Sequence, residues 1–336
     1  MHSSLGLAII VSSGVLIASF AAPMKLSRTW SWENTWLVYA TLALLVVPIA
    51  LVLLTIPHPI AFYAAIPLRT LLPSLLFGFG WGIAQVTFGL SIARVGMAMA
   101  FAIVVGLSSL LGSAIPLAVL HPADLASRPG AVLLASAVFL VAGLALYVSA
   151  DRKRESNARG AASSKVFLNG VLLCVFTGCF GSMINMGFVF GNRIAEQAVR
   201  QGISAESATL SVWAVVLAAG YLPNLGYTLF LLKKNQSVGL FRRSFAREFM
   251  LAFAGALLWL FGMLGYGVGA GKMEKYGNSI GFAVFMAVML LWSTSLGLIA
   301  GEWNSAPSVA QRRMRMGLAL IIVSMSVLGI GTLAHE

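Results

Sequence analysis

Ten long apolar stretches dominate this sequence and leave little chain outside them. Each is close to the roughly 20 residues that an α-helix needs to cross a hydrocarbon core of about 30 Å. They lie at approximately 5–22, 34–56, 70–93, 97–120, 130–150, 166–190, 208–232, 249–270, 278–301 and 314–333. Hydrophobic residues make up 59% of the chain and charged residues only 10%, unlike a water-soluble domain. The sequence therefore predicts an all-α polytopic membrane protein with ten transmembrane helices.

The first stretch ends in Ser19-Phe20-Ala21, which could pass for the cleavage site of a signal peptide. A signal peptide begins with positive charge, whereas only His2 precedes this apolar run. We therefore interpret residues 5–22 as a transmembrane span.

Basic residues are distributed unevenly between the two sets of connections. The first, third, fifth, seventh and ninth connections carry 16 of the 22 Lys and Arg residues. Because basic loops face the cytoplasm, both termini are predicted to lie outside a bacterial cytoplasmic membrane. The net charge of +12 is explained by these loops at the lipid surface, so we predict a lipid partner and no nucleic acid.

A repeated order of aromatic residues indicates that the chain is built from two halves. Phe88 follows Trp81 after six intervening residues, and Tyr266 follows Trp259 after six. We predict a first five-helix repeat at 1–150, a cytoplasmic linker at 151–165 and a second five-helix repeat at 166–336. Since each half has an odd number of spans, the halves must be inverted in the membrane. Inverted repeats are typical of secondary transporters, whose substrate site lies near the midplane.

The third span carries the polar group from which the site prediction starts. On a helix, Trp81, Gln85 and Phe88 fall at i, i+4 and i+7 and share one face. Gly78, Gly82 and Gly89 line an adjacent strip, where a neighbouring helix could approach closely. An amide in lipid is costly without a partner. Gln85 therefore either hydrogen-bonds another helix or faces a substrate cavity.

No charged side chain lies deep in any predicted span. A central Asp, Lys or Arg would cost about 2.5–3.5 kcal/mol, so this pattern favours a neutral, hydrogen-bonding substrate. The polar and aromatic residues of the spans suit a sugar, whose hydroxyl groups and C–H face they can bind. We predict that the site residues converge on one central cavity. They are Trp81, Gln85, Phe88, Asn185, Asn224, Tyr227, Trp259 and Tyr266.

Pro223 lies within the seventh span and has no N–H to donate to the carbonyl of Ala219. A helix broken there could let Asn224 line a cavity, or the proline could make an ordinary kink that its neighbours satisfy. Trp30, Trp32 and Trp36, before and within the second span, are interpreted as an interfacial aromatic belt.

Enzymatic activity is not predicted. The sequence has no HExxH motif, no paired carboxylates within the spans, and no Ser–His or Cys–His pair with suggestive helical spacing. We predict no cofactor and no metal. Alternatives to an uptake transporter are an exporter of neutral metabolites and a membrane sensor, although the chain has no soluble output domain.

Short motifs along the chain carry a family resemblance. They are Trp30-Ser31-Trp32-Glu33, Trp81-Gly82-Ile83, Phe88-Gly89-Leu90, Gly96-Met97, Asn224-Leu225-Gly226 and Gly301-Glu302-Trp303-Asn304. Their order and span number resemble the L-rhamnose–proton symporter family of the drug/metabolite transporter superfamily. The resemblance covers nearly the whole chain. It implies ten spans in two inverted halves and proton-coupled uptake of L-rhamnose or a similar deoxy- or pentose sugar. The family has Asn where Gln85 stands and Tyr where Phe88 stands, so the resemblance leaves the sugar open.

A proton symporter needs a group that titrates during transport, and no carboxylate lies in the middle of a span. Glu33 and Glu302 stand at span ends within the family-like motifs, so they are the candidates for proton coupling. The alternative is that both cap helices or pair with basic residues at the interface. Glu248 follows Arg247 and is interpreted as part of a surface ion pair.

Overall fold

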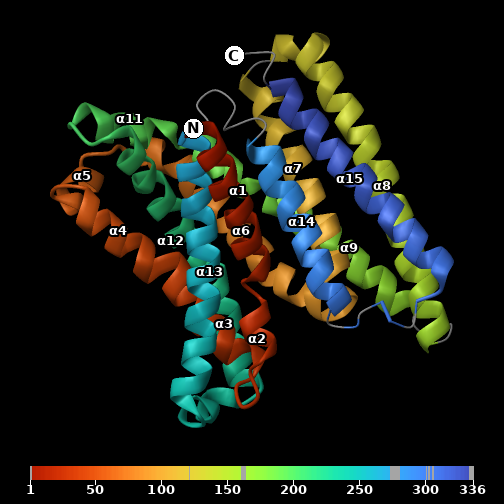
Figure 1. Cartoon of the computed structure of the whole chain (residues 1–336). Helices are drawn as coiled ribbons and strands as arrows, with labels where there is room; N and C mark the ends of the chain where they lie inside the picture. Colours follow the sequence, from red (N-terminus) through yellow and green to blue (C-terminus); the bar gives the residue numbers. More distant parts are fainter. Residues whose placement is uncertain are drawn as a thin grey trace. The chain divides into compact units, whose positions relative to one another are not determined.

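The computed structural model describes residues 2–120, 122–159, 164–272, 281–299, 301, 303–304 and 306–332. Within these ranges every regular element is a helix, as the sequence predicts. The α-helices are α1 His2–Ser19, α2 Ala22–Lys25, α3 Trp32–Ala40, α4 Val47–Thr55, α5 Pro59–Ala64, α6 Leu68–Val95, α7 Met97–Leu120, α8 Arg128–Arg159, α9 Ser164–Gly181, α10 Met183–Phe190, α11 Asn192–Arg200, α12 Ala205–Lys234, α13 Phe245–Lys272, α14 Phe282–Ile299 and α15 Ser308–Thr332 (Figure 1). The helices of other types are η1 Thr41–Val46, η2 Pro122–Ala126 and η4 Ser237–Arg242.

Seven segments of the described chain are long and apolar enough to cross a membrane. They are Ser4–Lys25, Trp32–Thr55, Leu68–Val95, Gly130–Ala150, Phe167–Arg200, Ser207–Lys234 and Phe245–Ala270. These segments match the first, second, third, fifth, sixth, seventh and eighth predicted spans, so the protein is a multi-pass α-helical membrane protein. The predicted spans 97–120, 278–301 and 314–333 coincide largely with α7, α14 and α15. That these three helices also cross the membrane stays a prediction.

The second span contains one widened turn. The π-helix η1 joins α3 to α4, and the Val47 N–H donates to the carbonyl of Leu42, five residues earlier. The next residue, Pro48, has no N–H with which to continue the α-helical ladder. Isolated π-turns of this kind are frequent at functional sites.

The chain forms two compact units, and each draws on both halves of the sequence. The first unit comprises Met1–Ser19, Thr87–Cys179 and Leu260–Glu336. The second comprises Phe20–Val86 and Phe180–Trp259. The predicted repeats, 1–150 and 166–336, divide the chain by sequence order and do not coincide with these two units. The repeats stay a prediction.

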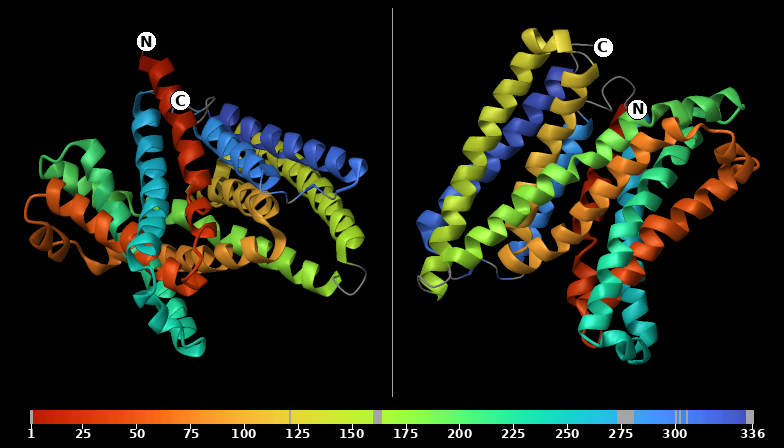
Figure 2. Two further views of the ribbon diagram at one scale, coloured as in Figure 1. Left: turned by 60° about the horizontal axis from the view of Figure 1, so that its bottom comes forward. Right: turned by 180° about the vertical axis from the view of Figure 1, so that it is seen from behind.

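In the first unit, α8 and α15 lie side by side (Figure 1, Figure 2). The Ser136 hydroxyl donates to the Ser324 carbonyl at 2.9 Å, and the Ser324 hydroxyl donates to the Ser136 carbonyl at 2.8 Å. Seven residues further along α8 and seven back along α15, a Cβ on Gly143 would lie 2.8 Å from the Gly317 carbonyl oxygen. The two helices are therefore antiparallel, and small residues let their backbones touch.

In the second unit, α6 and α12 also meet through glycines. A Cβ on Gly78 would collide with the carbonyl of Val216, and one on Gly82 with the carbonyl of Gly220. The predicted close approach along the glycine strip is thus confirmed at Gly78 and Gly82. This contact brings the backbone of α6 within reach of the polar side chains of α12.

Candidate functional site

Asn224 is the most fully bonded polar side chain among the predicted site residues of the second unit. Its Oδ1 accepts a hydrogen bond from the Trp36 indole Nε1–H at 2.8 Å. Its Nδ2 donates to the carbonyls of Gly220 at 2.8 Å and Gly82 at 3.2 Å. The side chain is fully buried, and α12 continues as a helix through Pro223. Asn224 therefore joins α3, α6 and α12, which favours the interpretation of Pro223 as an ordinary proline within a helix.

Aromatic rings surround this hydrogen bond. Trp32 stacks on Trp36 with ring centroids 5.0 Å apart, and Tyr227 meets Trp32 edge-on at 6.1 Å. We call Trp32, Trp36, Asn224 and Tyr227 the Trp36–Asn224 cluster. Trp30 and Trp36 are 6% and 2% exposed, so their assignment to an interfacial aromatic belt was wrong. The WSWENTW segment signalled aromatic residues at a span start, but it did not show that Trp36 turns inward to bond an amide.

Two further hydroxyls meet near the π-turn of the second span. The Thr41 and Tyr221 hydroxyl oxygens lie 3.0 Å apart, and the Thr41 hydroxyl also donates to the Leu37 carbonyl. Sequence reasoning missed Thr41, because a threonine in an apolar span carries no signal of its partner. The pair adds a second polar contact between η1 and α12.

The predicted site residues are distributed between the two units. Trp81, Gln85, Asn185, Asn224, Tyr227 and Trp259 belong to the second unit, whereas Phe88 and Tyr266 belong to the first. In the second unit the rings of Trp81 and Trp259 lie 5.9 Å apart, and Gln85 is 6% exposed. In the first, Phe88 packs edge-on against Phe101, and Tyr266 packs against Phe285. Convergence of the two groups on one cavity stays a prediction.

Glu33 is buried at the start of α3, with 3% of its surface exposed. Its Oε1 accepts hydrogen bonds from the Ser237 hydroxyl at 2.6 Å and the Asn235 amide at 3.0 Å. Within the described part of the chain, no basic side chain pairs with this carboxylate. Its place in the first turn lets the positive end of the helix stabilise its charge. Glu302, the other candidate for coupling, lies outside the described residues.

Glu248 is fully buried rather than at the surface, so the prediction of a surface ion pair was wrong in its placement. The pairing itself is confirmed, because Arg247 Nη1 lies 2.9 Å from Glu248 Oε1. The same oxygen accepts from the backbone N–H groups of Arg28 and Thr29 and from the Thr29 hydroxyl. Glu248 thus fixes the loop before α3 onto α13.

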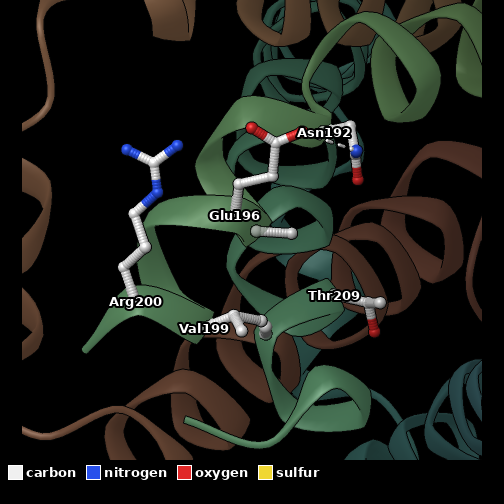
Figure 3. Close-up of a pocket in the computed structure, with 7 residues that line it drawn as sticks. Asn192, Glu196, Val199, Arg200 and Thr209 are labelled. Atoms are coloured by element: carbon white, nitrogen blue, oxygen red, sulfur yellow. Dashed lines mark hydrogen bonds between the residues drawn. The ribbon is translucent and has the colours of Figure 1, made fainter. Parts of the chain in front are cut away.

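Each unit also contains a cavity. In the second unit, a cavity of about 450 Å³ lies between α11 and α12. Asn192, Glu196 and Arg200 follow one face of α11 there, and the Asn192 amide donates to Glu196 (Figure 3). In the first unit, a cavity of about 510 Å³ lies beside α14 and α15. None of the predicted sugar-site residues lines the described walls of either cavity.

Together, the apolar spans define a multi-pass membrane protein that buries clusters of neutral polar groups. The model of the L-rhamnose-proton symport protein family matches residues 3–334. The chain therefore belongs to this family, which is a family of transporters and not of enzymes. It is 26% identical over 323 residues to the L-rhamnose-proton symporter of Shigella dysenteriae serotype 1, covering 94% of each chain. It shows the same identity and coverage with the L-rhamnose-proton symporter of Escherichia coli O1:K1.

Replacing Asn224 should destabilise the second unit. Asn224→Ala leaves the buried Trp36 indole N–H without an acceptor, so the free energy of unfolding should fall by about 1–3 kcal/mol. The measurement is thermal unfolding in detergent, with Asn192→Ala, which changes an exposed amide, as the matched control. In a double-mutant cycle, Trp36→Phe should cost less in the Asn224→Ala background than alone. Lost transport with an unchanged unfolding temperature would instead assign Asn224 to the substrate.

Proposed function

We propose that this protein is a secondary active transporter that takes up a neutral sugar, L-rhamnose or a similar deoxy- or pentose sugar, together with protons. The family match over residues 3–334 carries this proposal. The chemistry of the second unit supports a neutral substrate, because its buried Asn224 and Gln85 and its part-buried Thr41–Tyr221 pair are amides and hydroxyls. Export of neutral metabolites is the alternative. The two directions of transport can be distinguished by the orientation of the pH gradient that drives accumulation of the sugar.

We infer ten spans arranged as two inverted five-helix repeats. Support comes from contacts between spans that occupy the same position in the two halves. Spans two and seven pack as α3 with α12, four and nine as α7 with α14, and five and ten as α8 with α15. Spans three and eight meet through Trp81 and Trp259, the tryptophans at equivalent places in the two halves. Contacts between counterparts are what a two-fold axis in the membrane plane produces. The reciprocal Ser136–Ser324 bonds of α8 and α15 have the same symmetry.

The proposed orientation places the odd-numbered connections in the cytoplasm and both termini outside a bacterial inner membrane. It is supported by the excess of Lys and Arg in those connections. In this orientation Glu33 and Glu248 lie toward the cytoplasmic ends of their spans. A group in that position could release a proton to the cytoplasm.

Transport in proteoliposomes tests the proposed function. Labelled L-rhamnose should accumulate when a pH gradient, acid outside, is imposed, and should only equilibrate when the gradient is collapsed with a protonophore. A panel of pentoses and deoxyhexoses offered as competitors would identify the preferred sugar. If labelled sugar accumulates only when unlabelled sugar is preloaded inside the proteoliposomes, and an imposed pH gradient has no effect, proton symport would be contradicted.

Gln85 is proposed to bind the sugar. Gln85→Ala should weaken binding of L-rhamnose by about 1–3 kcal/mol, because a buried hydrogen bond is lost. The measurement is the sugar-dependent rise in unfolding temperature, since a bound ligand stabilises the folded state. Gln201→Ala, at the exposed end of α11, is the matched control. Equal stabilisation of wild type and Gln85→Ala by the sugar would show that Gln85 serves helix packing.

Glu33 is proposed to carry the coupled proton, with Glu302 as the second candidate. Glu33→Gln keeps an oxygen that Ser237 and Asn235 can bond, but it cannot titrate. The variant should lose accumulation driven by the pH gradient and retain exchange of labelled sugar between equal pools. Glu196→Gln, on the exposed face of α11, should retain both activities. Accumulation by Glu33→Gln at the wild-type level would move the coupling group elsewhere or exclude the proton as the driving ion.

A further inference from the structure

The cavity of the first unit contains polar groups that none of the proposed transport steps uses. Its volume is about 510 Å³, and its walls come from α14, from α15 and from the turn between them. Thr294 and Ser295 line it from α14, Asn304 from the turn, and Gln311 and Arg315 from the first turns of α15. Hydroxyl, amide and guanidinium groups thus face one space.

Thr294 is the group that most needs a ligand. The residue is 2% exposed, and its Oγ1 has no hydrogen-bond partner among the described residues. Its neighbour Ser295 donates to the Leu291 carbonyl at 2.9 Å, which is the usual solution for a hydroxyl on a helix. A buried hydroxyl without a partner costs free energy that a bound acceptor would restore.

The charge in the cavity favours an anionic acceptor. Arg315 lines the cavity and forms no ion pair with any described side chain. Arg312 and Arg313 lie three and two residues earlier on α15 and are exposed, as Arg315 is. All three are near the N-terminus of the helix, where its dipole also favours negative charge. A guanidinium group can hold two oxygens of a phosphate at once. These groups select a phosphate rather than a neutral molecule.

The rest of the lining is apolar, and part of it is exposed. Leu291 and Leu298 line the cavity from α14 and are 45% and 42% exposed, whereas Leu318 of α15 is buried. A soluble phosphate would leave Leu291 and Leu298 uncovered, whereas the acyl chain of a lipid would cover them. Polar and apolar walls in one cavity therefore suit an amphiphile.

We propose that this cavity binds the phosphate group of an anionic phospholipid, with Arg315 and Thr294 holding the phosphate and Leu291 and Leu298 of α14 contacting an acyl chain. In the proposed orientation the site lies in the cytoplasmic leaflet, which is rich in anionic lipid. Trp303, in the turn that closes the cavity, meets Tyr147 of α8 edge-on at 6.0 Å. A bound lipid would thus join α14 and α15 beside the contact of α15 with α8.

The test measures the affinity of the purified protein for lipid. Native mass spectrometry records the lipid-bound fraction as phosphatidylglycerol or phosphatidylcholine is added. Wild type should bind phosphatidylglycerol more tightly. Arg315→Gln should weaken that binding about tenfold or more, and Thr294→Val about threefold to tenfold. Arg313→Gln, which removes the same charge from an exposed residue of α15 that does not line the cavity, should change it by less than about twofold.

Several outcomes would overturn the proposal. Equal losses in Arg313→Gln and Arg315→Gln would indicate attraction by surface charge alone. Equal affinity for the two lipids would show that the cavity does not select a headgroup with net negative charge, and would overturn binding of an anionic lipid. Displacement of phosphatidylglycerol by L-rhamnose would assign the cavity to the sugar pathway. Competition by glycerol 3-phosphate at the same concentration as the lipid would overturn the lipid source while keeping a phosphate site. If Arg315→Gln fails to fold, the proposal is still tested by the affinity of Thr294→Val for phosphatidylglycerol and by the preference of the wild type for phosphatidylglycerol over phosphatidylcholine.

Discussion

A polar group buried in lipid must find its hydrogen-bond partners inside the protein, and the second unit depends on how Asn224 meets this requirement. Its amide bonds an indole on α3 and a carbonyl on each of α6 and α12. The carbonyl of Gly82 is within reach only because glycines let α6 and α12 touch. The hydrogen bond from the Asn224 amide to α6 therefore depends on the close packing of the α6 and α12 backbones. Neither would persist if Gly82 carried a larger side chain.

Local patterns in the sequence were sufficient to predict helical spans and the face on which Gly78 and Gly82 permit close approach. Hydropathy and small-residue spacing are properties of a single helix, so they can be read without knowing the neighbours. The partner of Asn224 is of another kind, because Trp36 stands 188 residues away along the chain. Burial of Glu248 likewise depends on a loop about 220 residues distant. Nothing in the periodicity of either helix records such contacts, which is why Trp36 and Glu248 were both placed at the surface.

The two buried carboxylates of the second unit differ in their partners. Glu248 is held by an arginine and by backbone N–H groups, so protonating it would break an ion pair and release a loop. Glu33 is held by a hydroxyl and an amide, both neutral, which can remain in place around a carboxyl group of either charge. The proposal that Glu33 couples the proton rests on this difference. Sequence position alone made the two residues look more alike, since both stand at the start of a span.

The antiparallel contact of α8 with α15 has a consequence for biogenesis. Residue Ser308, where α15 begins, leaves the ribosome about 150 residues after α8 is complete. During that interval Ser136 and Gly143 lack the partners that the mature protein gives them, and both lie on an apolar helix already inserted in the bilayer. Other surfaces with small residues could occupy that face in the meantime, including those of neighbouring nascent chains. The small-residue face of α8 would therefore stay unpaired until α15 has been inserted, and assembly of the first unit would be completed only at the end of synthesis.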